Sequence, residues 1–225
     1  MSGIGVVPLG LKPKAKVDSP SLTTTNSRTG VAIFYVITIL LIGIIVYLLY
    51  FPNCVYIVFD NGYSYKVYNT GNSDENIKAG VLLNEINEFG LTVATYLRDN
   101  EHRFMEQKYF IENILHRYNP DGLEEKNISF TGTSFTQNKG STMVLCLRDK
   151  KTGKLQDPNT IKYVYLHELC HVGAVTWQHT TEFWESFIWL LKTLDDAGIY
   201  KTLDYNKTPK PYCGIVIDST PYFST

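Results

Sequence analysis

The sequence predicts an α+β domain that follows a single N-terminal transmembrane helix, and three observations support this fold class. Residues 31–51 form an uncharged apolar run. The remainder of the chain alternates short β-like segments with longer segments of helical periodicity. A hydrophobic content of 44% is sufficient for a compact core, and the 16 tyrosines and 11 phenylalanines favour a substantial strand component. We therefore expect a flexible tail (1–30), a transmembrane helix (31–52) and one folded domain (53–225).

The two N-terminal segments differ sharply in composition. The tail is rich in Ser, Thr, Gly and Pro and shows no apolar periodicity, which is typical of a flexible segment. The apolar run would form a helix about 31 Å long, which matches the hydrocarbon thickness of a bilayer. Pro52 ends this helix, and Tyr47 and Tyr50 lie near its far end, where aromatic belts occur. A buried core helix is an alternative. A cleaved signal peptide is another, but the run is too long and begins too late for one.

The flanking charges predict the orientation of the span. Basic residues dominate before it, whereas the charges just after it balance: Lys12, Lys14, Lys16, Arg28 and Asp18 precede it, and Asp60 and Lys66 follow. The positive-inside rule then places the N-terminus in the cytoplasm and the C-terminal domain in an extracellular or lumenal compartment.

All four cysteines follow the span, which permits disulfide bonds in such a compartment: they are Cys54, Cys146, Cys170 and Cys213. Cys213 has Cys54 and Cys146 as candidate partners, and no pairing is the third alternative. Asn127 and Asn206 begin Asn-x-Ser/Thr sequons. Glycosylation and chance occurrence explain these two sequons equally well.

The first half of the domain is expected to contain a hairpin and helices. Residues 55–59 and 63–67 read as strands around the turn Asp60-Asn61-Gly62. A helix capped by Ser73 or Asp74 runs through Ile86, and helical periodicity resumes over 91–118, with a break near Asn100.

The second half is expected to contain two strands and two helices. A turn at 119–122 precedes strands at 130–135 and 141–147, which join around Asn138-Lys139-Gly140. Asp157-Pro158 begins a helix that ends near Gly173, because Pro is favoured at the first helical position. A further helix runs from about Thr180 to Gly198.

The helix that Asp157 begins carries the pattern H-E-x-x-H. Three of the five histidines of the chain, His167, His171 and His179, fall within this short stretch. Residues i and i+4 share a helix face, so His167 and His171 can hold one tetrahedral Zn²⁺. Glu168 then lies beside the water that such a metal binds and acts as the catalytic base. His179 is the expected third ligand, because the chain can turn back after Gly173.

Other side chains near the motif offer alternatives. Glu182 and Glu185 compete with His179 for the third ligand position. Cys170 lies inside the motif, and we interpret it as a core residue rather than a ligand. Tyr205 and Tyr212 are candidate phenols for stabilising an oxyanion.

The strand at 141–147 has two interpretations of equal standing. As an edge strand beside the active-site helix it would bind substrate by β-augmentation, and as an ordinary core strand it would only pack.

The residues around the motif resemble a known family. The run Tyr165-Leu166-His167-Glu168-Leu169-Cys170-His171, followed by His179 and Phe183-Trp184, is similar to the minimal zincin peptidases of the SprT-like and WLM type. The runs 133–140 and 212–214 look like a membrane-anchored subgroup of large DNA viruses. The resemblance covers 129–217 and implies a small zincin-like metallopeptidase fold, with zinc on His167, His171 and His179. The chain lacks the paired-cysteine zinc ribbon and the basic tail of soluble relatives, which puts a DNA-linked role in doubt.

Two functions from different classes follow. The first is a membrane-anchored zinc metallopeptidase that acts on peptides or proteins, with Glu168 as the base. The second is a catalytically silent zincin-fold protein that serves a structural or interaction role in a membrane or virion. The net charge of −1 and the absence of a Lys/Arg cluster beyond the N-terminal lysines argue against a nucleic-acid partner.

Overall fold

A computed structural model describes residues 25–50, 53–129 and 131–223 of the chain. The chain divides into two compact units, Met1–Phe51 and Pro52–Thr225, which are described separately. The flexible tail expected at 1–30 lies outside the described residues up to residue 24. From Thr25 onward the chain is helical, so the helix begins before the expected boundary at residue 31.

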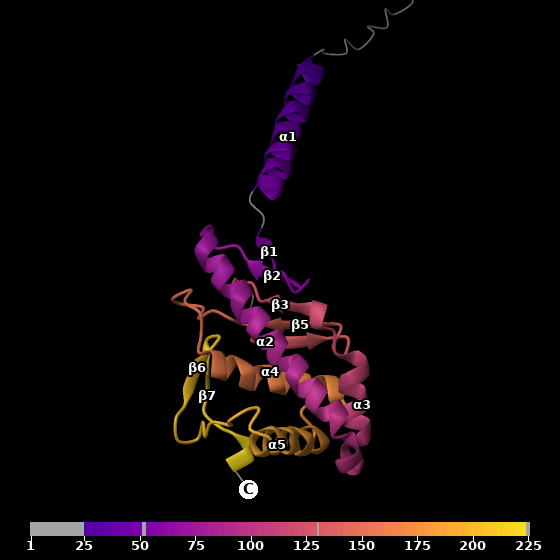
Figure 1. Ribbon diagram of the computed structural model, residues 1–225. Helices are drawn as coiled ribbons and strands as arrows, with labels where there is room; N and C mark the ends of the chain where they lie inside the picture. Colours follow the sequence, from indigo (N-terminus) through magenta and orange to yellow (C-terminus); the bar gives the residue numbers. More distant parts are fainter. Residues whose placement is uncertain (1–24, 51–52, 130, 224–225) are drawn as a thin grey trace, which may run out of the picture. The chain divides into compact units, whose positions relative to one another are not determined.

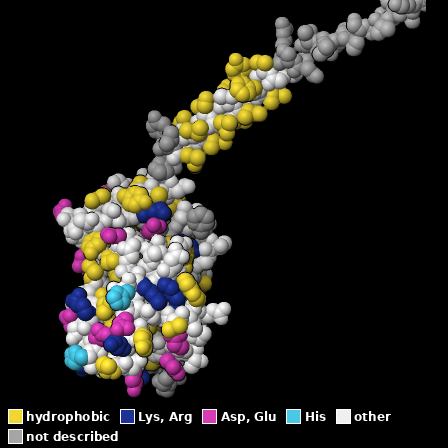
Figure 2. Space-filling model, turned by 90° about the vertical axis from the view of Figure 1, so that its right-hand side faces the viewer, with side chains coloured by type: hydrophobic (Ala, Val, Ile, Leu, Met, Phe, Trp, Pro, Cys, Tyr) yellow, Lys and Arg dark blue, Asp and Glu magenta, His cyan; other side chains and the backbone are white. Residues whose placement is uncertain are grey.

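The first unit contains the apolar helix α1 (Thr25–Tyr50). Its segment Thr29–Leu48 is 20 residues long, is apolar enough to cross a membrane and has no buried residue. At ~1.5 Å per residue this segment spans about 30 Å. Hydrophobic side chains cover the face of the helix that Figure 2 shows. A core helix would be mostly buried, whereas none of this segment is, so the core-helix alternative is not supported.

The second unit is built on a mixed five-stranded sheet in the order β1-β2-β3-β5-β4. Its strands are β1 (Cys54–Val58), β2 (Ser64–Tyr68), β3 (Leu123–Glu125), β4 (Phe135–Gln137) and β5 (Thr142–Leu145). The hairpins β1–β2 and β4–β5 are antiparallel, and β3 pairs in parallel with β2 and β5. A separate hairpin joins β6 (Lys210–Tyr212) and β7 (Ile215–Ile217).

Four helices pack with the sheet in the α+β arrangement that the sequence predicts. They are α2 (Ser73–Asp99), α3 (Lys108–Arg117), α4 (Pro158–Gly173) and α5 (Thr181–Asp196). Figure 1 shows the long α2 crossing the strands, with α4 and α5 stacked below the sheet. Short 3₁₀ turns lie at Glu101–Arg103, Met105–Gln107, Pro120–Gly122 and Pro221–Phe223. Most of α4 is buried, so this helix forms the centre of the domain.

The expected interruption of α2 before Leu91 is wrong. The helix continues through Gly90 to Asp99, and only the predicted break near Asn100 is present. Gly90 lies where α2 crosses α4, because a Cβ atom there would stand 2.0 Å from the Tyr165 hydroxyl. The glycine therefore allows two helices to approach closely and does not end one.

Two short strands, β4 and β3, differ from what the sequence predicts. The strand expected at 130–135 is displaced: β4 begins only at Phe135, residues 131–132 form a bend, and residues 133–134 have no regular secondary structure. The strand β3 (Leu123–Glu125) was not expected. Both strands are three residues long, and neither shows the apolar alternation that identifies a strand in sequence.

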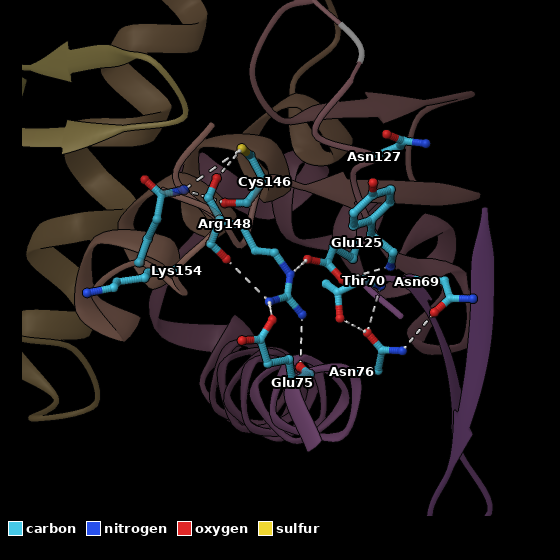
Figure 3. A network of polar contacts seen from close by, with 12 residues as sticks. Asn69, Thr70, Glu75, Asn76, Glu125, Asn127, Cys146, Arg148 and Lys154 are labelled. Carbon is cyan, nitrogen blue, oxygen red and sulfur yellow. Dashed lines mark hydrogen bonds and ion pairs between the residues drawn. The ribbon is translucent and has the colours of Figure 1, made fainter. Parts of the chain in front are cut away.

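A buried ion pair ties the sheet to α2 (Figure 3). The Arg148 and Glu125 side chains are 2% and 0% exposed, and Arg148 Nε donates to Glu125 Oε1 at 2.8 Å. Arg148 Nη2 also donates to the Glu75 carbonyl at 2.8 Å, and the Tyr68 amide donates to Glu125 Oε2 at 2.8 Å. The hydrogen bonds satisfy both charges, as a buried ion pair requires.

A disulfide bond joins Cys146, just after β5, to Cys213 in the β6–β7 turn. This decides between the partners that the sequence leaves open for Cys213. Cys54 and Cys170 are free thiols. The bond attaches the β6–β7 hairpin to the sheet at the end of β5.

Candidate metal centre

Helix α4 places the first two histidines. Asp157 accepts a hydrogen bond from the Thr160 amide and Pro158 occupies the first turn, so the helix begins where the sequence predicts. His167 and His171 lie one turn apart, with ring centroids 5.1 Å from each other. The Phe183 ring of α5 packs against both imidazoles, at 4.9 and 4.4 Å. This contact restricts the orientation of both rings.

The third histidine reaches the same point from the loop after α4. His179 Nε2 lies 2.8 Å from His167 Nε2 and 3.1 Å from His171 Nε2. A tetrahedral ion with bonds of about 2.0 to 2.1 Å would need neighbouring nitrogens about 3.3 Å apart. Both distances to His179 are within a few tenths of an ångström of this value, and all three ligand nitrogens lie within 4.8 Å of one another. Among the described residues, these three form the one cluster with this metal-ligand geometry.

The two competing carboxylates are engaged elsewhere. Glu182 accepts hydrogen bonds from the Val175 amide at 3.0 Å and from the Thr176 hydroxyl at 3.0 Å. Glu185 is exposed and lines a different pocket, beside Trp189. The geometry thus favours His179 over both glutamates.

The electrostatics of the cluster suit metal binding. Burial, together with the neighbouring imidazoles, lowers the pKa of His167 to about 3 and that of His171 to about 4. Burial also lowers the pKa of His179. All three rings are consequently neutral near pH 7, and neutral imidazole is the form that binds a metal.

Glu168 lies beside the cluster and is almost fully buried, at 6% exposure. Thr136 on β4 donates its hydroxyl hydrogen to Glu168 Oε2 at 2.9 Å. Burial raises the pKa of Glu168 to about 7, although the Thr136 hydrogen bond opposes the shift. A carboxyl group with such a pKa can both accept and release a proton near neutral pH.

These side chains line a cleft of about 290 Å³. The other lining residues are Thr133, Ser134, Phe135, Thr136, Lys139 and Trp177. Our sequence interpretation assigned no role to any of them. Their residue types are common and they lie far from the motif along the chain, so only the partial run 133–140 of the family resemblance pointed to this region.

The expectation that Tyr205 or Tyr212 faces the reacting groups is not supported. Neither tyrosine lines the cleft. The Tyr212 hydroxyl is hydrogen-bonded to the Ser134 hydroxyl at 2.6 Å, and the Tyr205 ring packs on Tyr163 at 4.8 Å. Both side chains are buried structural residues.

Two further expectations concern β5 and Cys170. The segment 141–147 contains β5, which lies between β3 and β4, so its core-strand interpretation is confirmed and its edge-strand interpretation is wrong. The edge beside α4 is β4, as the bonds between Thr136 and Glu168 show. Cys170 is fully buried in the core, as expected.

Together the fold and the cleft define an α+β protein with a membrane-length helix, a three-histidine cluster and a buried glutamate. The chain is 41% identical over 155 residues to the uncharacterized protein R325 of Acanthamoeba polyphaga mimivirus, which covers 69% of this chain and 77% of that protein. It therefore belongs to the same protein family as this mimivirus protein.

A second viral relative covers a shorter segment. The chain is 39% identical over 69 residues to the uncharacterized protein 136R of Invertebrate iridescent virus 6, which is 30% of this chain and 38% of that protein. No family model and no solved structure matches the chain.

Proposed function

We propose that the protein is a membrane-anchored zinc metallopeptidase with a zincin-like fold. The observation that carries the proposal is the convergence of three neutral imidazoles beside a buried carboxyl group in an open cleft. His167, His171 and His179 would hold the ion, and three protein ligands leave a fourth position open for chemistry. Bound zinc would supply Lewis acidity toward a water molecule and the carbonyl group of the substrate.

The chain itself would bind the substrate and move the proton. A peptide would extend the sheet along the free edge of β4, because edge strands pair readily with extended segments. Phe135 and Trp177 would contact its side chains, as both line the cleft with exposed rings. Glu168 would accept a proton from the attacking water and deliver it to the leaving amine, while Thr136 holds its carboxylate.

The N-terminal helix would anchor this domain. The helix α1 has the length and composition of a span, and the charge distribution around it predicts a cytoplasmic N-terminus with the domain in an extracellular or lumenal compartment. A virion membrane is one such location, in keeping with the viral relatives.

The test uses the full-length chain in detergent. We expect about one zinc per chain by elemental analysis and cleavage of casein. Glu168→Gln should retain the zinc and lose 10²-fold or more of the activity. Glu185→Gln, which changes an exposed glutamate of α5, is the matched control and should behave as wild type.

Two outcomes would contradict the proposal. If the chain takes up no zinc, the metal site is refuted. If it binds zinc but Glu168→Gln changes nothing, hydrolysis is refuted, and the catalytically silent alternative is then preferred.

A further inference from the structure

The turn between β4 and β5 has an unusual backbone. Asn138 and Lys139 both have positive φ angles, of 47° and 56°, and the Gly140 amide donates to the Gln137 carbonyl at 3.1 Å. Two consecutive left-handed residues are typical of a type I′ hairpin turn. A Cβ atom at Gly140 would stand 2.7 Å from the Arg117 carbonyl oxygen. The glycine thus lets the turn pack against the end of α3.

The turn brings the Lys139 ammonium group to the end of α4. Lys139 Nζ donates to three backbone carbonyls, those of His171, Ala174 and Thr176. An ammonium group has three donors, so all of them are used. The Lys139 Nζ also lies over the Trp177 ring, 4.8 Å from its centroid. A cation at this position is favoured further by the negative C-terminal end of the helix dipole.

Glu182 binds the same loop by accepting hydrogen bonds from it. Its carboxylate accepts hydrogen bonds from the Val175 amide and from the Thr176 hydroxyl. The carbonyl groups of the segment 174–179 therefore bind the Lys139 ammonium group, and its Val175 amide and Thr176 hydroxyl bind the Glu182 carboxylate. We call these two side chains, Lys139 and Glu182, the loop clamp.

His179 depends on this loop for its position. It is an exposed residue, unlike His167 and His171, which are half-buried on α4. Its ring contacts Phe183 and Trp184, at 4.7 and 5.4 Å, but its backbone belongs to the clamped loop. We propose that Lys139 is a positioning residue that sets the third metal ligand, and through it the zinc affinity of the site. This inference rests on the metal site of the proposed function.

The first test measures the zinc dissociation constant of the full-length chain in detergent, by competition with a chromophoric chelator. Lys139→Met should weaken zinc binding 10- to 100-fold, the usual effect of removing a group that orients a ligand. The matched control is Lys126→Met, because Lys126 is a buried lysine that donates to the Thr131 carbonyl at 2.6 Å and does not line the cleft. It should change the constant less than twofold.

A double-mutant cycle separates positioning from a general effect. His179→Ala should weaken zinc binding by itself, and adding Lys139→Met to it should have little further effect, because the ligand that Lys139 positions is gone. An equal effect of Lys139→Met in both backgrounds would overturn the proposal. So would unchanged zinc affinity with reduced cleavage, which would instead indicate that the ammonium acts on the substrate.

Hydrogen exchange of the metal-free chain provides a readout that does not require zinc. Lys139→Met should accelerate amide exchange in residues 174–179, whereas Lys126→Met should not. If Lys139→Met does not fold, Lys139→Arg, which keeps the charge, should show an intermediate acceleration. Normal protection of this loop in the variant would refute the clamp. Failure of wild type to bind zinc would instead refute the proposed function.

Discussion

At the scale of single residues, the contact between Thr136 and Glu168 bears most directly on the proposed hydrolysis. The Thr136 hydroxyl is 2.9 Å from Glu168 Oε2, and it also reaches the Glu168 carbonyl at 3.2 Å. One hydroxyl thus links the edge strand to the glutamate of the motif. Because the carboxylate is buried, the loss of this donor would leave it both less well oriented and less well solvated.

We therefore predict that Thr136→Val, which keeps the side-chain shape, lowers kcat about tenfold and changes KM little. Thr136→Ser should restore most of the activity, because it keeps the hydroxyl. Steady-state kinetics on a casein-derived peptide would measure both effects. A rise in KM at constant kcat would show instead that Thr136 contacts the substrate.

The half-buried His167 should make the metal-free domain sensitive to acid. The pKa of His167 is lowered to about 3 by burial, whereas an unfolded histidine titrates near 6.5. The unfolded chain therefore binds the proton more tightly. The contribution of the neutral His167 ring to the unfolding free energy is fully present above about pH 6.5 and is lost as the pH falls toward 3.

We predict that wild type loses on the order of 2–3 kcal/mol of unfolding free energy relative to His167→Gln between pH 7 and pH 4. Tryptophan fluorescence in urea, with a chelator present, would measure this. Its signal reports on the domain alone, since the three tryptophans of the chain are Trp177, Trp184 and Trp189. Glu168→Gln should show the opposite trend: the pKa of Glu168 is raised to about 7, so wild type loses stability relative to this variant as the pH rises from 4.5 to 7.

The residues of the cluster differ in how well sequence could identify them. His167, Glu168 and His171 were identifiable because helical periodicity fixes their relative positions. Identifying His179 as the third ligand required only the prediction of a short loop and a new helix, and Thr180 caps this helix through the Phe183 amide. Thr136 and Lys139 were not identifiable, because they reach the cleft through the pairing of β4 with β5, and neither residue type suggests a role by itself.

At the scale of elements, the crossing of α2 and α4 depends on Gly90. Alanine normally favours a helix by about 1 kcal/mol over glycine. Here the added Cβ would stand 2.0 Å from the hydroxyl oxygen of Tyr165, a fully buried residue. Overpacking of this kind typically costs about 1–3 kcal/mol, so it exceeds the gain in helix propensity.

We predict that Gly90→Ala lowers the unfolding free energy by about 1–2 kcal/mol, measured by urea denaturation. Tyr165→Phe removes the obstructing oxygen, so the double variant Gly90→Ala/Tyr165→Phe should recover much of the loss. Destabilisations that simply add would mean that the two residues do not interact.

The same crossing shows what limits prediction of elements. Helices α4 and α5 were predicted from their caps and apolar periodicity, which are local signals. The predicted interruption before Leu91 is wrong because the role of Gly90 is tertiary: Tyr165 of the partner helix lies about 75 residues further along the chain. The three-residue strands β3 and β4 likewise exist because β5 pairs with both of them.

At the scale of the whole molecule, the disulfide joins distant parts of the second unit. Cys146 and Cys213 are separated by 67 positions, and the bond closes a loop that includes α4 and α5. Cross-links of this kind stabilise a domain by about 2–4 kcal/mol, mainly by restricting the unfolded chain. We predict that Cys146→Ser/Cys213→Ser lowers the unfolding free energy by that amount in urea. Cys54→Ser should have little effect, because this cysteine is free and only partly buried; an equal loss in both variants would contradict the prediction.

The disulfide also bears on the orientation in the membrane. Disulfide bonds persist in oxidising compartments and are rare in the cytosol. The charges around the apolar helix independently predict a cytoplasmic N-terminus. Both arguments support the proposal that the domain with the cleft lies on the non-cytoplasmic side, and Asn206 there would offer an exposed sequon.

We therefore predict that the chain, translated with microsomal membranes, receives a glycan that Asn127→Gln/Asn206→Gln abolishes, and that its domain resists added protease. Replacing Lys12, Lys14 and Lys16 by Gln should reduce the glycosylated fraction, because it removes most of the charge asymmetry on which the orientation depends. A domain that is digested, unglycosylated and unaffected by these lysines would be cytoplasmic. The disulfide would then have to form in a reducing compartment, which its chemistry disfavours.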